Sequence, residues 1–425
     1  MKGWKSVTVG DLCKIKHGWA FKGEYFADNG KYFLLTPGNF NESGGLKLKV
    51  GKEKYYSGEF PKEYLLERDD LLVVMTDLIQ SAPILGGSAM TPQNDKFLHN
   101  QRLGKVFDIN EVLTTKKFLY WLFNFEGYRC QIRGSASGAT VRHTAPERIY
   151  KCKAALPPLP AQKKIAGILS AYDDAIENNL RRIKLLEEMA QITYEEWFVR
   201  LRFPGHTTTP INKATGLPEG WNKKENGDCC EVSGGGTPSR EVPEYWEDGK
   251  IKWFSPTDLS KANSLCLLDS SDKITEFGLK KSSARLMGKH TFMMTSRATI
   301  GLFGIVDIDY STNQGFINVT PLKPDHKYFL LFNFKYRVDE FIGHASGATF
   351  PEISKSKFKK LKIVWPSENI ISLFHQYCSP IVAEMMNLTK QNQRLREARD
   401  ILLPRLMTGV IDAERFQPEN FLKKN

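Results

Sequence analysis

The sequence predicts an α/β fold of the α+β kind, in which two similar globular domains are each followed by a long helix. The first observation is an internal repeat. Residues 136–140, ASGAT, return at 345–349, and Asn100-Gln101 returns as Asn313-Gln314. The matching segments keep their order at offsets between 209 and 219 residues. A repeat of this length indicates two copies of one domain rather than a solenoid of small units.

Each predicted domain mixes short apolar strands with turns. In the first domain, residues 1–157, the segments 32–40 and 69–77 are rich in β-branched and aromatic residues and predict strands that lead into loops. Residues 116–132 predict a buried helix just before the first ASGAT segment, and residues 326–342 are its counterpart in the second domain, residues 220–367.

Near-heptad spacing of apolar residues predicts a spacer helix after each domain, at 158–202 and 368–408. The residues expected to pack between the helices are Leu169, Tyr172, Ile176, Ile183, Leu186, Ile381, Leu388, Leu395 and Leu402. Helices of roughly 35 residues are about 50 Å long. Two of them most economically pack on each other and hold the domains apart. A Pro/Thr/Gly linker at 203–219 joins the halves, and residues 409–425 form a C-terminal tail.

The charge of the chain favours a polyanionic partner. The formal net charge is +12 and the isoelectric point is near 9.1, which is typical of nucleic-acid-binding proteins, although a charge that serves only solubility is the alternative. No apolar run approaches the roughly 18 residues that a membrane span requires. The N-terminus lacks a secretory apolar core, and seven cysteines without CxxC spacing favour reduced thiols. These features predict a cytoplasmic protein without a membrane partner.

Familiar catalytic motifs are missing from the sequence. It contains no GxxxxGK[ST] phosphate loop, no HExxH motif and no GxSxG nucleophile elbow. Pro157-Pro158 lacks the polar residue and the stacking aromatic that chemistry on a flipped base requires. The glycines at 234–236 indicate a loop turn more readily than a phosphate cradle. We therefore predict no catalytic residue and no metal site.

Polar residues that follow predicted strands are the candidates for DNA contact. Short hydroxyl side chains bind phosphates, arginine binds guanine edges or phosphates, and asparagine and glutamine can bind adenine in the major groove. The candidates are Thr76, Asp77, Gln80, Ser81, Asn100, Gln101, Arg102 and Arg142 in the first domain, and Thr295, Ser296, Arg297, Thr299, Asn313 and Gln314 in the second.

Each candidate also has a structural explanation. The loops after the strands match between the halves at Met75-Thr76 and Met294-Thr295. They are equally well explained as solvent-exposed loops whose sequences have diverged. Asn and Gln are common turn and backbone-capping residues. The basic run at Lys355, Lys357, Lys359, Lys360 and Lys362 fits phosphate neutralisation or a solvated face.

The chain resembles the specificity subunit of a type I restriction-modification enzyme. The segments that carry the resemblance are LPPLPAQKKIAGILSAYDDAIENN (156–179), GLPEGWNKKENGDCCEV (216–232) and LLPRLMTGVID (402–412). In that family two target-recognition domains, related by a pseudo-two-fold internal repeat, flank an antiparallel coiled coil of the two helices. The chain departs from the family at Ala161-Gln162, where a Glu-Gln pair is usual, and at the short proline run Trp365-Pro366. Both departures are expected where partner subunits dock.

The resemblance implies a non-catalytic DNA-binding subunit in which each domain recognises one half of a split site. It implies double-stranded DNA, two modification subunits and restriction subunits as partners. S-adenosylmethionine, ATP and Mg²⁺ are then expected on those partners, with no cofactor in this chain. Two alternatives stay open: a standalone DNA methyltransferase or nuclease with unrecognised motifs, and a free-standing coiled-coil transcriptional regulator.

Overall fold

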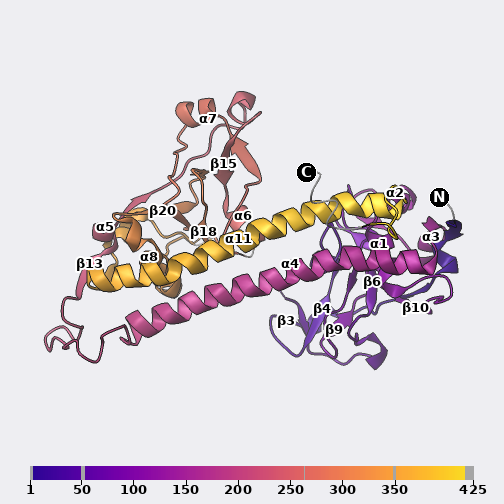
Figure 1. Cartoon of the computed structure of the whole chain (residues 1–425), viewed down its shortest axis with the longest axis horizontal. Coiled ribbons are helices and arrows are strands. Elements are labelled where there is room, and N and C mark those ends of the chain that lie inside the picture. Colours follow the sequence, from indigo (N-terminus) through magenta and orange to yellow (C-terminus); the bar gives the residue numbers. More distant parts are fainter. Residues whose placement is uncertain (1–2, 49–52, 263, 348–350, 417–425) are drawn as a thin grey trace. The chain divides into compact units, whose positions relative to one another are not determined.

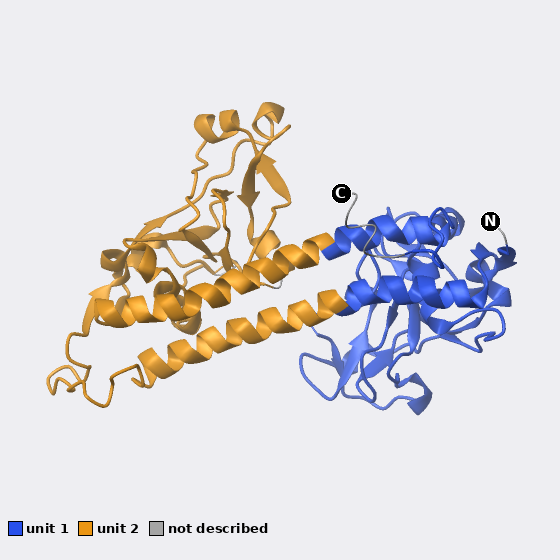
Figure 2. Cartoon of the chain, viewed as in Figure 1, with its two compact units in different colours: residues 1–174, 395–425 blue, residues 175–394 orange. Residues whose placement is uncertain are grey.

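The structure, a computed structural model, describes residues 3–48, 53–262, 264–347 and 351–416. It divides into two compact units, which Figure 2 colours separately. Unit 1 comprises residues 1–174 and 395–425, and unit 2 comprises residues 175–394. Each unit therefore contains one globular domain together with part of both long helices.

Two four-stranded sheets form the core of the first domain (Figure 1). The central sheet has the order β2 (Lys14–His17), β10 (Leu103–Phe107), β6 (Leu71–Val74), β8 (Ser88–Met90), and the outer sheet has the order β3 (Phe26–Ala27), β5 (Tyr55–Tyr56), β4 (Tyr32–Leu35), β9 (Phe97–His99). Two further ladders pair β1 (Lys5–Thr8) with β12 (Lys153–Leu156) and β7 (Thr76–Asp77) with β11 (Arg142–His143). The helices are α1 (Lys116–Asn124), α2 (Glu126–Ser135) and α3 (Pro146–Tyr150).

Strand β6 is buried on both faces because alternate residues pack on different layers. Leu71 and Val73 belong to a core that contains Trp121 of α1 and Leu169 of the first long helix. Leu72 and Val74 instead pack against the outer sheet. The period of two along a strand explains this division.

The second domain repeats the architecture of the first. Its central sheet has the strand order β14 (Cys230–Ser233), β20 (Phe316–Pro321), β17 (Phe292–Thr295), β18 (Phe303–Ile305). Its outer sheet has the strand order β16 (Asp272–Ile274), β15 (Ile251–Phe254), β19 (Ser311–Thr312). A small ladder pairs β13 (Asn222–Glu225) with β21 (Lys362–Trp365). The helices are α5 (Asn226–Cys229), α6 (Pro256–Ala262), α7 (Glu276–Lys281), α8 (Lys327–Tyr336), α9 (Val338–Gly343) and α10 (Lys355–Lys360). Matching strand orders, including one parallel pair in each outer sheet, confirm that the two domains share a fold.

Strand register corrects the alignment of the two copies. Val74 faces Leu103 across β6 and β10, and Thr295 faces Phe316 across β17 and β20. Because Phe316 is the counterpart of Leu103, the counterpart of Thr295 is Val74. The sequence match of Met75-Thr76 with Met294-Thr295 is therefore wrong by two residues. Such a shift leaves each side chain on the same face of a strand, so the apolar pattern could not reveal it.

Each predicted buried helix before the ASGAT segment is broken in two. Phe125, between α1 and α2, has φ −77° and ψ 131°, which is extended backbone. In the second domain Arg337 separates α8 from α9 with φ −97° and ψ 16°. Burial of Phe118 and Tyr128 on both sides of the first break shows that tertiary packing favours the bend. Residues 348–350, in the second ASGAT segment and just after it, lie outside the described residues.

The long helices are α4 (Leu159–Tyr194), extended by a π-helical turn at Glu195–Val199, and α11 (Glu368–Met407). In unit 1, Arg399 of α11 pairs with Asp173 of α4 at 2.5 Å. In unit 2, Arg182 pairs with Glu384 at 2.8 Å, and Thr193 Oγ1 donates to Tyr377 Oη at 3.2 Å. Partner numbers fall as α4 advances, so the helices are antiparallel.

The predicted packing residues of both helices are buried or half-buried. The buried ones are Leu169, Ile176, Ile183, Ile381, Leu388 and Leu402, and the half-buried ones are Tyr172, Leu186 and Leu395. In unit 1, Leu169 and Leu402 also belong to the core of the first domain. In unit 2, Ile183 and Ile381 belong to the core of the second domain. The helices are thus fused to the domains rather than appended to them.

Gln162 fixes the start of α4 to the first domain. Its side chain is fully buried, accepts from Thr114 Oγ1 at 2.9 Å and donates to the carbonyl oxygens of Leu113 and Pro157, both at 2.8 Å. Trp365 is only 4% exposed. Gln162 and Trp365, at the two departures from the family pattern, are therefore buried side chains, and the docking of partner subunits at these places stays a prediction.

All seven cysteines are free thiols, six of them buried. Within the described part of the chain, no three His, Cys, Asp or Glu side chains lie close enough together to hold a metal ion. The same residues include no helix that is both long enough and apolar enough to cross a bilayer.

Candidate nucleic-acid interface

Three loops meet at the end of β6 in the first domain. Met75 N donates to Arg102 O at 2.9 Å, and Thr144 N donates to Met75 O at 2.9 Å. Strands β7 and β11 then pair Asp77 with Arg142. We call the residues 76–82, 100–102 and 137–143 the first loop set. It brings together candidates that the sequence had placed in three separate segments.

The equivalent loops meet at the end of β17 in the second domain. Ser296 N donates to Gly315 O at 2.9 Å, and Ile353 N donates to Ser296 O at 3.0 Å. Arg297 forms a β-bridge with Glu352. The second loop set comprises residues 296–301 and 313–315, together with the described parts of 344–353. Glu352 corresponds to His143, because both lie at the same distance after their ASGAT segment. Arg297 faces Glu352 as Thr76 faces His143, so Arg297 is the counterpart of Thr76.

Four of the predicted contact residues are buried and shape the loops instead. Asp77 is 1% exposed, and its carboxylate accepts from Ile79 N at 3.0 Å and Ile84 N at 2.8 Å. Thr295 donates from Oγ1 to Thr299 O at 2.5 Å and accepts from Leu302 N at 2.9 Å. Thr76 and Ser296 are 5% and 2% exposed. All four side chains are thus buried in this structure, and their direct contact with DNA stays a prediction.

The paired asparagines serve as turn caps. Asn100 Oδ1 accepts from Arg102 N at 2.9 Å, and Asn313 Oδ1 accepts from Gly315 N at 2.8 Å. Of the two explanations that the sequence allowed, capping is therefore the one observed for both asparagines. Each cap orients the neighbouring glutamine, Gln101 or Gln314, which is exposed.

The remaining predicted contacts lie at the surface. Exposed side chains are Gln80, Ser81, Gln101, Arg102, Arg297, Thr299 and Gln314. Arg142 is half-buried and donates from Nη2 to Arg133 O at 2.9 Å, in the last turn of α2. A cation at that end of a helix is favourable, so Arg142 has a structural role in addition to any contact with DNA.

Two apolar residues of the first loop set escaped the sequence analysis. Leu78 is 60% exposed and Ile79 is 56% exposed, directly before Gln80. Apolar side chains can contact the methyl group of thymine in the major groove. Sequence gave no signal for them, because an apolar residue after a strand is expected to be buried.

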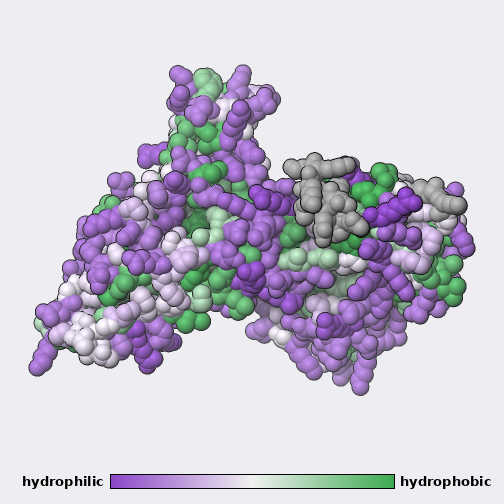
Figure 3. Space-filling model, in the orientation of Figure 1, coloured by the Kyte–Doolittle hydropathy of each residue, from purple (hydrophilic) through white to green (hydrophobic). Residues whose placement is uncertain are grey.

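A run of basic residues follows the second loop set along the chain. Lys355, Lys357, Lys359 and Lys360 are exposed on α10, which begins two residues after Ile353. Lys362 pairs with Glu225 at 3.0 Å. Figure 3 shows hydrophilic residues over much of the visible face of the second domain. The exposed lysines of α10 suit contact with a phosphate backbone.

The fold and these loops define a class of protein: a duplicated binding protein that presents the same loop frame twice with different side chains. The family model for the type I restriction modification DNA specificity domain matches residues 1–188 and 218–390. The chain belongs to this family.

Individual relatives agree with the family match. The chain is 24% identical to the Type I restriction enzyme HindI specificity subunit of Haemophilus influenzae, over 97% of this chain and the whole of that protein. It is 34% identical to the MjaIX specificity subunit of Methanocaldococcus jannaschii, over 48% of this chain and 47% of that one. The match thus spans about half the length of the second relative. The crystal structure of a type I S subunit from M. genitalium has the same fold, with a TM-score of 0.55 and 16% identity over 95% of this chain and 96% of that chain.

Proposed function

We propose that the chain is the DNA-recognition subunit of a type I restriction-modification complex. Each loop set contacts one half of a bipartite DNA site, and the helix pair sets the distance between the halves. One observation carries the proposal: two domains of the same fold present equivalent loops whose exposed side chains differ. They are Leu78, Ile79 and Gln80 in the first loop set and Arg297 and Thr299 in the second. Two copies of one frame with different tips suit two different half-sites.

The division of labour follows from the chemistry of DNA recognition. Contacts to phosphates position a protein on the duplex, and contacts to base edges specify the sequence. Two half-sites that face the same side of B-DNA and are one helical turn apart have centres separated by roughly 34 Å. Helix α4 has 36 residues and is therefore about 54 Å long. A packed helix pair of this length is stiff enough to fix such a spacing.

The proposal extends to partners. Two modification subunits would dock on the helix pair and supply adenine methylation with S-adenosylmethionine, and restriction subunits would add ATP- and Mg²⁺-dependent activity. The chain itself would contribute recognition without catalysis, in the cytoplasm. The exposed apolar residues Leu185, Ile192 and Ile401 on α4 and α11 support a protein partner on these helices.

Methylome sequencing tests the proposal. Co-expression of the chain with its modification subunits should yield a methylated motif of two half-sites separated by a fixed gap, and deletion of the chain should remove it. An unchanged methylome after deletion would contradict the proposal. Incubation of the purified chain alone with DNA and labelled S-adenosylmethionine should leave the DNA unlabelled, whereas a standalone methyltransferase would label it.

A further inference from the structure

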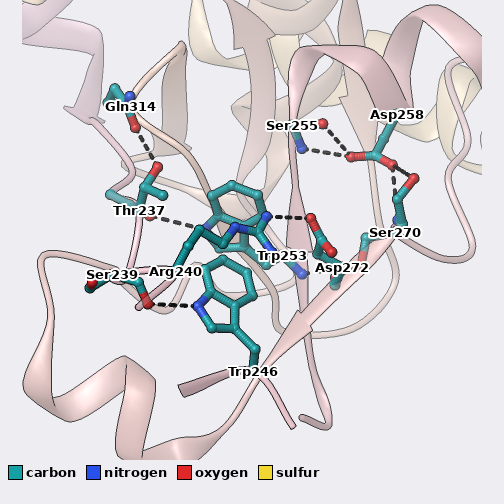
Figure 4. A network of polar contacts seen from close by, with 12 residues as sticks. Thr237, Ser239, Arg240, Trp246, Trp253, Ser255, Asp258, Ser270, Asp272 and Gln314 are labelled. Atoms are coloured by element: carbon teal, nitrogen blue, oxygen red, sulfur yellow. Dashed lines mark hydrogen bonds and ion pairs between the residues drawn. The ribbon is translucent and has the colours of Figure 1, made fainter. Parts of the chain in front are cut away.

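The glycine-rich segment 234–236, for which the sequence predicts a loop turn, leads into a loop that runs beside the second loop set. Gly236 N donates to Thr312 O at 2.9 Å, and Thr237 Oγ1 donates to Gln314 Oε1 at 2.6 Å (Figure 4). A Cβ on Gly235 would lie 2.0 Å from Thr312 O. Only glycine permits so close a backbone approach. We call residues 236–240 the Arg240 loop, and these contacts join it to the exposed Gln314.

Arg240 is held in one orientation at the end of this loop. Its guanidinium carbon lies 3.6 Å from the ring centroid of Trp246, and Nη2 donates to Asp272 Oδ2 at 2.5 Å. The Arg240 side chain is nevertheless 53% exposed, and that of Asp272 is 40% exposed. Figure 4 shows the guanidinium between the indole and the carboxylate. The arginine is thus fixed on one side and open to solvent on the other.

Two tryptophans support both the arginine and the backbone of its loop. Trp246 Nε1 donates to Ser239 O and Trp253 Nε1 donates to Gly236 O, each at 2.9 Å. Trp253 is 4% exposed and lies on β15 of the outer sheet. The loop is therefore anchored to a rigid strand and cannot swing independently of it.

This arrangement suits recognition of a base more than attraction to a phosphate. Guanine presents O6 and N7 in the major groove, and a bidentate arginine is the commonest specific contact to it. Such a contact requires a planar donor in a fixed orientation, and pre-organisation lowers the entropic cost of binding. A phosphate needs only a nearby positive charge, which the exposed lysines of α10 already provide.

The equivalent place in the first domain is built differently. Trp19 N donates to His99 O at 2.9 Å, as Gly236 does to Thr312 in the second domain. There the chain forms an open hollow of about 740 Å³, lined in part by Trp19, Lys22, Tyr25 and Phe60. The same position beside the Asn-Gln turn therefore presents different chemistry in the two domains, as readers of different half-sites require.

We propose that Arg240 is a specificity-determining residue of the second domain that binds a guanine of its half-site, with Trp246 and Asp272 as positioning residues. This inference rests on the proposed function. It adds a fourth loop to the three that meet at the end of β17.

The test uses the full chain in complex with its modification subunits and compares Arg240→Ala, Arg240→Lys, Asp272→Asn and the control Lys223→Ala. Lys223 is an exposed cation on β13, so its loss matches the change in charge. The methylome of wild-type complexes first defines the motif. Binding is then measured on DNA that carries the motif and on DNA with single guanine replacements.

Arg240→Ala should lose discrimination at one guanine of one half-site by about 5- to 150-fold, with the other half-site unchanged. Arg240→Lys should not restore it, since lysine lacks the planar guanidinium that Trp246 and Asp272 hold in place, and Asp272→Asn should lose part of it. Lys223→Ala should keep the wild-type motif. Thermal unfolding of each variant should match the wild type, and Arg240→Lys keeps the test informative should Arg240→Ala fail to fold.

Two results would overturn the inference while leaving the proposed function intact. One is a wild-type motif for Arg240→Lys. The other is an equal loss of affinity for all sequences with a shallower salt dependence, which is the signature of a phosphate contact. Failure of the proposed function would instead be seen in the wild type, which would show no bipartite motif that depends on the chain.

Discussion

At the scale of single residues, the loop sets separate side chains that hold the loops from those that face solvent. Asp77 and Thr295 satisfy backbone groups in the interior, whereas Arg102 and Arg297 are exposed. Buried hydrogen bonds of this kind fix loop shape, because an unmade one costs about 1–3 kcal/mol. The exposed residues can therefore differ between the two domains without a change in the conformation of the loops.

We expect Arg297→Ala to abolish recognition of one half-site only. A good side-chain contact to a base contributes about 1–3 kcal/mol of discrimination, and the first loop set is untouched. Binding of the complex to DNA with either half-site scrambled measures the effect. Arg102→Ala is the matched variant in the first domain and should affect the other half-site; unchanged specificity in both variants would defeat these assignments.

His99 should make the stability of the first domain sensitive to acid. It is fully buried beside the first loop set, its Nε2 lies 2.9 Å from Leu103 O, and its Nδ1 has no hydrogen-bond partner among the described residues. Burial lowers the pKa of His99 from 6.5 to about 4. The folded state therefore binds fewer protons than the unfolded state between these values, so stability falls as the pH decreases from 6.5 to 4.

The loss attributable to His99 is about 3 kcal/mol over this window. Hydrogen exchange of β9 and β10 at pH 7, 5.5 and 4.5 measures it. His99→Gln should flatten the pH dependence of protection, and His290→Gln, at an exposed histidine of unit 2, should not. Equal slopes for the wild type and His99→Gln would rule out this origin of acid sensitivity.

At the scale of elements, a polar pair interrupts the apolar seam of the helices. Asn179 Nδ2 donates to Asn392 Oδ1 at 3.0 Å, and the two are 7% and 1% exposed. The packing residues of the two helices, such as Leu169 and Ile381, repeat at an offset of 212 residues. Asn179 and Asn392 are 213 residues apart, so each helix meets its repeat counterpart close to this pair. A buried Asn pair in a coiled coil specifies register at a cost in stability.

The single variants Asn179→Leu and Asn392→Leu should each lower the unfolding free energy by about 1–3 kcal/mol, because the remaining amide is buried without its partner. The double variant should regain the lost unfolding free energy, but its two helices should no longer pair in a single register. Thermal unfolding and light scattering report the two effects. Wild-type stability in both single variants would show that the pair does not contribute to register.

The elements also show what the sequence can predict. The repeat and the heptads were predicted correctly, because periodic burial is written directly into residue spacing. The breaks at Phe125 and Arg337 and the two-residue shift at Thr295 were not, since each depends on contacts between distant segments. Burial of Thr76 and Ser296 was missed for the same reason: a polar residue at a strand end gives no sign of which loop will cover it.

The candidate site was predicted in part. Sequence located all three loops and the glutamines, and it offered capping as an explanation for Asn100 and Asn313. It missed Arg240, because the aromatic and acidic partners of that arginine come from Trp246 and Asp272, on other elements. Only the folded outer sheet brings them together.

At the scale of the whole molecule, we expect the helix pair to act as a ruler. Insertion of seven residues into both α4 and α11, at matched seam positions, keeps the apolar stripe in phase and adds about 10 Å to each helix. The gap in the methylated motif should then lengthen by about 3 base pairs at 3.4 Å per pair. Methylome sequencing measures the gap, and an unchanged gap would refute the ruler.

The composition of unit 1 has a consequence for synthesis. Its core joins Trp121 of α1 and Leu169 of α4 with Leu402, Leu406 and Met407 of α11. A nascent chain cannot complete this core until Leu402, Leu406 and Met407 have left the ribosome. The core of the second domain extends only to Leu388, so the first domain matures after the second. Messages truncated shortly before Leu402 should yield chains whose first domain is readily degraded.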